Sequence, residues 1–162
     1  MDFTNIEVRA LWWKQPFASM MLHDKVETRT WDTTYRGWVL ICCSMEGYTF
    51  KQLRKTTGLK QMARIREALD GRGSFHLNGL AIAVGRLTHC QPMHPADEDM
   101  CFVKYDEDLY CHVYEDVMAI VPFKPFEKGQ VGWKSLDDEV KRQIVLLRNL
   151  NQFEYAEMVG GT

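Results

Sequence analysis

One short segment, residues 25–31, combines side chains that could recognise a polar ligand. It alternates long polar or aromatic residues with β-branched ones, which predicts a half-buried strand. Because side chains two positions apart share one face of a strand, a cation, a carboxylate, a guanidinium and an indole would project together. These are Lys25, Glu27, Arg29 and Trp31. We expect the other face, which carries Val26, Thr28 and Thr30, to point to the core, although an ordinary solvated strand face would show the same alternation.

Two adjacent tryptophans precede this segment. Residues 6–13 are rich in β-formers, so Trp12 and Trp13 are expected to point to opposite sides of a strand. Only one of the two indoles can then enter the core. An exposed indole offers a π-face to a nucleobase, worth about 1–3 kcal/mol for each stacked base. Packing under the helix that follows is the alternative, and the pattern leaves both open.

A basic stretch lies between positions 51 and 72. Hydrophobic spacing predicts helices over 49–70, with Gly58 dividing them. Basic residues four positions apart on a helix repel each other slightly unless a negative group comes near. That group could be a nucleic-acid phosphate or the acidic loop 97–108 of the same chain, and a solvated helical face is the third alternative. The basic residues are Lys51, Arg54, Lys55, Lys60, Arg64, Arg66 and Arg72.

Other arrangements that could carry chemistry are weak in this sequence. His89, Cys90, His94 and Cys101 match no common zinc spacing, so we expect no metal. No P-loop, GxGxxG motif or Ser/His/Asp arrangement occurs, so no cofactor is expected.

Composition and charge narrow the class of protein. The chain has 162 residues, 46% of them apolar, which is typical of one globular domain. Lys plus Arg number 20 against 22 Asp plus Glu, and a formal charge of −2 argues against binding by bulk positive charge. No apolar run is long enough for a membrane span, and the first residues lack the plan of a signal peptide. Five cysteines without a CxxC pair favour reduced thiols and a cytoplasmic location.

The elements that must position these residues follow from periodicity and turn signals. Pro16 is expected at the start of a short helix, and Gly85 marks a bulge or bend. The continuous apolar run 38–44 predicts a central strand covered on both faces. Strands are expected over 6–13, 25–31, 38–44, 79–90, 110–121 and 131–134.

These strands do not alternate regularly with helices. The chain is therefore predicted to be α+β, built around a mixed, mostly antiparallel, barrel-like sheet. We expect a single domain over 1–162, with a helical insertion at about 49–72 and a C-terminal helical extension at about 136–158. Val140, Ile144 and Leu147 would form the apolar stripe of that last helix.

The opening of the chain resembles the ASCH domains of the PUA-like superfamily. Members of this family begin with a strand that runs into a Lys-Gln-Pro-Trp-Ala turn, followed by a GxKxxExR motif, a Tyr-Arg-Gly turn and a strand ending in serine. The matching places here are residues 14–18, Glu27, Arg29, residues 35–37 and Ser44. Later segments, GLAIAVGRLTHC, YCHVYEDVMAIVPF and QVGW, resemble the family's remaining strands, so the resemblance covers most of residues 8–135.

The resemblance implies a small PUA-like barrel with a cleft beside its first helix, used to recognise RNA or a modified nucleotide. The matching cleft residues are Lys14, Gln15, Glu27, Arg29, Tyr35, Arg36, Ser44 and Trp133. The strand arguments above add Trp13 and Trp31. One branch of the family, which resembles N4-acetylcytidine amidohydrolases, has a lysine where this chain has Asp24, so the nucleophile of that branch is missing here.

Our first hypothesis is therefore binding of RNA or a modified nucleotide. Trp13 or Trp133 would stack the base, while Glu27 and Arg29 would read its edge or a phosphate. Lys14 and Arg36 would hold backbone phosphates, and the helices at 49–70 would extend the electrostatic contact.

Two alternatives remain. The chain could be a hydrolase of nucleosides or RNA, with Glu27 and either Lys14 or Lys25 as acid–base partners. A buried Glu27 of raised pKa beside an unpaired lysine would favour this alternative. It could also be a regulatory protein whose helices at 49–70 bind another protein through an exposed apolar patch. The sequence does not indicate the oligomeric state.

Overall fold

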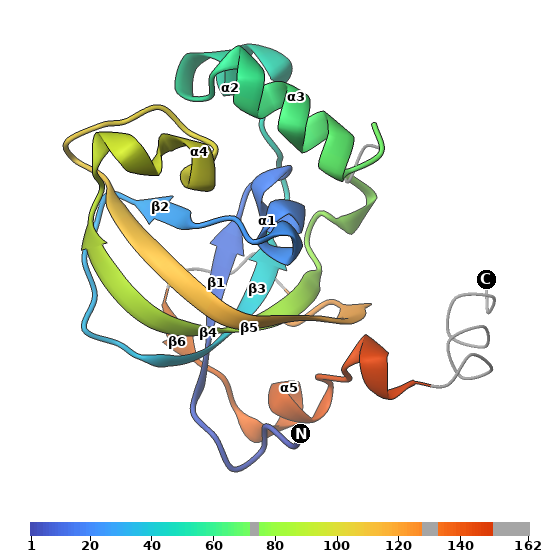
Figure 1. The fold of residues 1–162 in the computed structure, drawn as a ribbon. Helices are drawn as coiled ribbons and strands as arrows, with labels where there is room; N and C mark the ends of the chain where they lie inside the picture. The colour runs from blue at the N-terminus through green and yellow to red at the C-terminus, as the bar shows by residue number, and fades with distance from the viewer. Residues whose placement is uncertain (72–74, 128–132, 151–162) are drawn as a thin grey trace.

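Residues 1–71, 75–127 and 133–150 are described by a computed structural model (Figure 1). The chain is α+β, with one mixed six-stranded sheet that curls into a half-barrel. Its strands are β1 Val8–Trp13, β2 Glu27–Arg29, β3 Gly37–Cys43, β4 Ala81–Pro92, β5 Tyr110–Phe123 and β6 Lys134–Ser135. The helices are α1 Phe17–Met20, α2 Phe50–Thr56, α3 Leu59–Ala68, α4 Glu98–Cys101 and α5 Asp138–Arg142. Short 3₁₀ turns lie at Met21–His23, Phe75–Leu77, Pro95–Asp97 and Leu147–Asn149.

The strands lie in the order β2-β5-β4-β3-β1-β6. β1 pairs parallel with β3, and every other neighbouring pair is antiparallel, as predicted for a mixed and mostly antiparallel sheet. The pairing of β4 with β5 shifts register between Val84 and Arg86, which places a bulge at Gly85 as its sequence position indicated. In the part of the chain that the structure describes, the edge strands β2 and β6 do not pair, so the barrel is only half closed.

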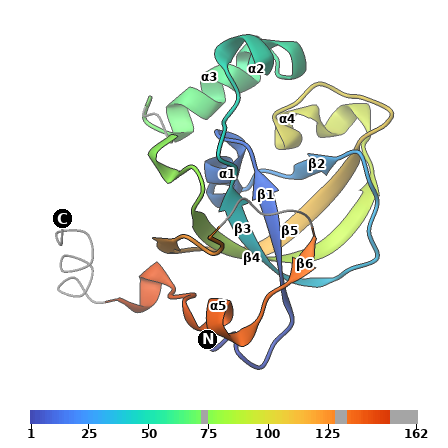
Figure 2. The same cartoon turned by 180° about the vertical axis from the view of Figure 1, so that it is seen from behind.

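Two apolar clusters cover the two faces of this sheet. β3 contributes Val39 and Ile41 to one cluster and Leu40 to the other, which confirms the prediction of a strand buried on both faces. The first cluster includes Phe17 of α1, and the second includes Val140 of α5. Figures 1 and 2 show α1 to α4 on one side of the sheet and α5 on the other.

The helical insertion is formed by α2 and α3, and Gly58 divides the two helices as predicted, because it is the N-cap of α3. Thr49 caps α2 through a reciprocal pair of hydrogen bonds with Gln52, which fixes where the first helix begins. Leu53 and Ile65 turn inward and join the first apolar cluster. The insertion is thus packed on the sheet domain.

The acidic segment 97–108 is partly helical, whereas the sequence predicted a loop. It contains α4, and Asp99 of this helix accepts hydrogen bonds from Lys60 Nζ at 3.4 Å and from Gln61 Nε2 at 3.2 Å. Arg64 Nη1 donates to the backbone oxygen of Asp99 at 3.0 Å. The negative partner of these α3 residues is therefore the acidic segment of the same chain.

Strand 25–31 differs from its prediction in length and in orientation. Only Glu27–Arg29 pairs in the sheet, and the charged side chains point inward: Lys25 is 3% exposed and Glu27 is 6% exposed. Thr30 is exposed instead. The expectation that the β-branched face would point to the core is met only by Val26, which packs against the first apolar cluster. Lys25 and Glu27 of the other face are more buried, because the charged groups satisfy one another and can therefore leave water.

The C-terminal helix is also shorter than predicted. α5 ends at Arg142, and the chain then returns to the sheet, where Val121 donates its N–H to the oxygen of Val145 and Ile120 bridges to Leu146. These backbone contacts with β5 replace the next helical turns. The remainder of the predicted helix, 151–158, lies outside the described residues. No helix among the described residues has the length and apolar character to cross a membrane.

A matched pair of leucines in the insertion tests its packing. Leu53→Ala should lower the free energy of unfolding by about 2–4 kcal/mol, because the buried side chain leaves a cavity. Leu59→Ala, at a side chain 73% exposed, should change it by less than about 0.5 kcal/mol. Urea denaturation of both variants measures the difference, and equal effects would show that α2 does not pack against the sheet.

Candidate functional site

A single cleft collects many of the residues expected to bind a ligand. It has a volume of about 690 Å³ and lies between the end of β1, strand β2, the end of α2 and the segment 103–109. Six of the predicted site residues line it: Trp13, Lys14, Glu27, Arg29, Trp31 and Ser44. Residues from separate segments of the chain thus meet around one hollow.

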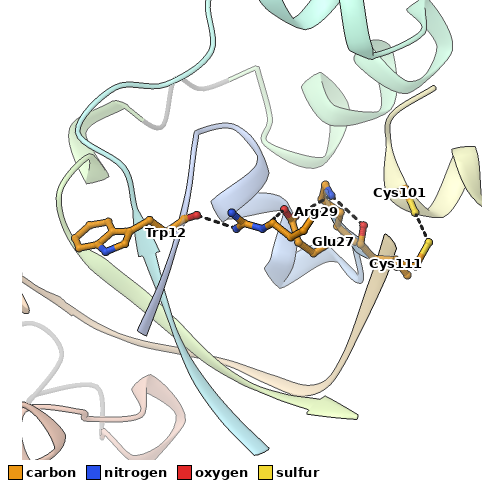
Figure 3. Close-up of polar contacts among 7 residues, drawn as sticks. Trp12, Glu27, Arg29, Cys101 and Cys111 are labelled. Carbon is orange, nitrogen blue, oxygen red and sulfur yellow. Dashed lines mark hydrogen bonds and ion pairs between the residues drawn. The ribbon is translucent and has the colours of Figure 1, made fainter. Parts of the chain in front are cut away.

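At the floor of the cleft lies a cluster of three charges, in which Lys25 and Glu27 are buried and Arg29 is half-buried. Lys25 Nζ lies 3.1 Å from Glu27 Oε2, and Arg29 Nε lies 3.1 Å from Glu27 Oε1 in an ion pair that is not a hydrogen bond. Lys25 Nζ also donates to the backbone oxygen of Val26 at 2.9 Å, and Arg29 Nη2 donates to that of Trp12 at 2.8 Å (Figure 3). The Glu27 carboxylate is therefore held between two cations that the backbone anchors.

The charges around Glu27 decide its protonation. Burial by itself would raise the pKa of this carboxyl, but the adjacent Lys25 and Arg29 outweigh burial and leave the pKa below its ordinary value of 4.5. Glu27 is thus ionised at neutral pH and offers oxygen atoms that accept hydrogen bonds. It is poorly suited to donate a proton.

Trp13 is not available as a stacking surface, contrary to the sequence expectation. Its side chain is almost completely buried, the Arg29 guanidinium carbon lies 5.0 Å from its ring centroid, and Tyr114 packs edge-on at 5.8 Å. A base could stack there only if Arg29 moved. Trp13 supports Arg29 from below.

Trp31 is more accessible in the cleft than Trp13. It is half-buried and lies edge-to-face with His112 at 4.7 Å. Burial lowers the pKa of His112, so its ring is neutral at neutral pH, and its Nε2–H donates to the Trp31 backbone oxygen at 2.9 Å. His112 therefore fixes the position of Trp31.

Two residues considered for the site, Gln15 of the resembling motif and Lys25, have structural roles below the cleft. Gln15 is fully buried, and its side chain donates to Ser19 Oγ at 2.8 Å and to Cys43 Sγ at 3.4 Å. It holds α1 against β3 and cannot touch a ligand. Lys25 likewise does not line the cleft, so its contribution is to position Glu27.

Three further predicted residues lie outside the cleft lining. Tyr35 Oη donates to the backbone oxygen of Trp38 at 2.8 Å, and Arg36 Nη1 donates to the oxygen of Thr33 at 2.9 Å. Trp133 packs edge-on against Tyr35 at 5.2 Å and against Trp31 at 5.5 Å. Its neighbours in the QVGW motif, 130–132, lie outside the described residues.

Several lining residues were not anticipated as site residues. The most informative come from α1, the segment before α2, α2 itself and the segment after α4: Phe17, Tyr48, Lys55, Val103, Lys104 and Tyr105. Lys55 belongs to the basic stretch recognised in the sequence, but nothing in the sequence placed the segment 103–109 over β2. A backbone hydrogen bond from Lys104 N to the oxygen of Thr56, at 2.7 Å, brings that segment to the end of α2.

A pair of thiols lies next to the segment 103–109 that lines the cleft. Cys101 and Cys111 are buried free cysteines whose sulfur atoms lie 3.6 Å apart in a hydrogen bond, with no disulfide between them (Figure 3). Burial raises the pKa of both thiols, so they remain protonated and act as packing groups. Among the described residues, no cluster of three or more His, Cys, Asp or Glu side chains could hold a metal ion.

Comparison with known proteins assigns no family to the chain. No protein-family model matches the chain, and no curated protein sequence matches it.

The buried charges predict a pH dependence of stability. Since the pKa of Glu27 is lower in the folded protein than in the unfolded chain, its contribution is present above about pH 4.5 and is lost as the pH falls through the folded value. Glu27→Gln should cost about 3–5 kcal/mol at neutral pH, because Lys25 loses its buried counter-charge. Its stability should fall less steeply in acid than that of the wild type.

Denaturant unfolding at a series of pH values measures both effects. Glu107→Gln is the control, because this exposed carboxylate has no ion pair among the described residues. Parallel pH profiles of the wild type and Glu27→Gln would contradict the interpretation.

Proposed function

We propose that the cleft binds a nucleobase, presented either by RNA or by a modified nucleotide. The observation that carries this proposal is the juxtaposition of an ionised, immobile carboxylate with a half-buried indole in one hollow. Glu27 and Trp31 both line the cleft, and each is fixed from behind, by Lys25 and His112 respectively.

The polar floor suits the edge of a heterocycle. A carboxylate accepts from the exocyclic amine of cytosine, adenine or guanine, and a guanidinium donates to ring nitrogens, carbonyl oxygens or phosphate. Lys25 and Arg29 each contact a different oxygen of Glu27, and the Trp13 indole lies beside the same carboxylate. A carboxylate has about four acceptor positions, so one is left for a ligand. Such preorganised groups lose little entropy when they bind.

The walls suit the faces of a base. Trp31 and Tyr48 are half-buried, and Tyr105 is 41% exposed at the cleft. Aromatic side chains stack on any base because every base has a π-face, which suits an unpaired or flipped-out nucleotide. The volume of about 690 Å³ is within the range of small-molecule sites, roughly 300–1,000 Å³.

We also propose that the chain is a member of the family that its sequence resembles. The half-barrel, the short helix α1 beside the cleft and the position of Glu27 and Arg29 on β2 support the membership in the PUA-like ASCH domains that the sequence suggested. The five free cysteines fit the cytoplasmic location expected for this chain.

The contacts at the cleft give less support to the two alternatives, a hydrolase and a protein-binding module. A hydrolase with Glu27 as general acid requires a raised pKa and an unpaired lysine, whereas Glu27 has a lowered pKa and Lys25 is paired with it. Phe50 and Leu59 of the insertion are exposed, but two side chains are fewer than a protein-binding patch contains.

The test is calorimetric titration of the full chain with common and base-modified nucleosides, their 5′-phosphates and short RNAs, with turnover assayed in parallel. Trp31→Ala should weaken binding of every ligand that the wild type binds by about five- to a hundredfold, as expected for one lost stacking contact.

Trp38→Phe is the matched control. Trp38 packs against Phe3 in the second apolar cluster, away from the cleft, so its conservative substitution should leave the affinity unchanged. Equal losses in both variants, or no binding by the wild type to any ligand in the panel, would overturn the proposed function.

A further inference from the structure

Three lysines from separate parts of the chain meet at the cleft. Lys14 follows β1, Lys55 lies near the end of α2, and Lys104 lies in the segment after α4. All three side chains are exposed, and none forms an ion pair within the described part of the chain. The hydrogen bond from Lys104 N to Thr56 O makes Lys104 and Lys55 neighbours across two elements.

The charge of the cleft differs from that of the whole chain. Four basic residues line it, the three lysines and Arg29, against two acidic ones, Glu27 and Asp106. Glu27 is already neutralised by its own ion pairs, so three lysines face one exposed carboxylate, in a chain whose formal charge is −2. Such a local excess of positive charge attracts an anion.

The other basic residues of the insertion are not available in the same way. Lys60 and Arg64 of α3 bind Asp99, and the guanidinium carbon of Arg64 lies 4.5 Å from the ring centroid of Phe102. The basic residues of α3 therefore hold the insertion against the segment that contains Asp99 and Phe102, whereas Lys55 of α2 lines the cleft.

We infer that Lys14, Lys55 and Lys104 bind a phosphate group on the sugar of the nucleotide whose base lies in the cleft, so that the ligand is a nucleotide and not a nucleoside. This inference rests on the proposed function. Ammonium groups bind phosphate as compact point charges with three donors each. The sequence analysis expected Arg36 to hold phosphate, but Arg36 donates to the backbone oxygens of Thr33 and Tyr35 and does not line the cleft. In this inference Lys55 and Lys104 bind the phosphate instead.

The phosphate can belong to a free nucleotide or to an RNA strand. Titrations with ribonucleosides, their 5′-monophosphates and a mixed single-stranded hexaribonucleotide, at about 50 and about 200 mM salt, separate the two sources. We expect the best monophosphate to bind about tenfold or more tightly than its nucleoside at the lower salt, from charge-assisted hydrogen bonds. A still tighter hexamer with a steeper salt dependence identifies a strand, and equal affinity of hexamer and monophosphate identifies a free nucleotide.

Charge-matched variants test the residues. Lys55→Gln and Lys104→Gln should each reduce the preference for monophosphate over nucleoside by about threefold or more, in keeping with one lost contact to a charged group. Lys51→Gln is the control, because it removes the same charge from the same helix but its side chain does not line the cleft.

The possible failures are distinct. Equal affinity for nucleoside and monophosphate, or an equal effect of Lys51→Gln and Lys55→Gln, would overturn the phosphate assignment while base binding stands. If neither nucleosides, monophosphates nor the hexamer bind, the proposed function fails as well.

Discussion

The buried contact among Lys25, Glu27 and Arg29 is the constraint on which the site depends. Two cations and one carboxylate can leave water only together, because any one of them alone would pay a large desolvation cost. Their mutual contacts, and the backbone oxygens of Val26 and Trp12 that anchor the cations, set the inward orientation of β2. The same contacts keep Glu27 ionised at the floor of the cleft.

A second set of contacts builds the wall above this floor. The Asp99 carboxylate accepts hydrogen bonds from Lys60 and Gln61 of α3. The backbone oxygen of Thr56, at the end of α2, accepts a hydrogen bond from the backbone N–H of Lys104. These are exposed or half-exposed interactions, each worth little alone. They act together with the buried Leu53 and Ile65, so the insertion is held to the segment that carries Lys104 and Tyr105. The cleft is therefore shared between the sheet and the insertion.

Much of the fold could be predicted because it follows from local patterns. The apolar run of β3, the break at Gly58 and the bulge at Gly85 are each encoded by residue types within a few positions. The length of the last helix could not be predicted in this way, because Val145 and Leu146 leave the helix to contact β5, more than 20 residues earlier in the chain. Long-range pairing outweighed an amphipathic pattern there.

The sequence by itself determined which residue types stand at two-residue spacing along residues 25–31, and hence that Glu27, Arg29 and Trp31 could act together. Only the tertiary structure decided which face of that strand is buried, since alternation is identical for both faces and a charged face is buried only where partners such as Lys25 surround it. It also decided that Trp13 supports Arg29, that Gln15 and Trp133 do not line the cleft, and that Lys55 and Lys104 do. Such contacts join residues far apart in the chain, and no local pattern records them.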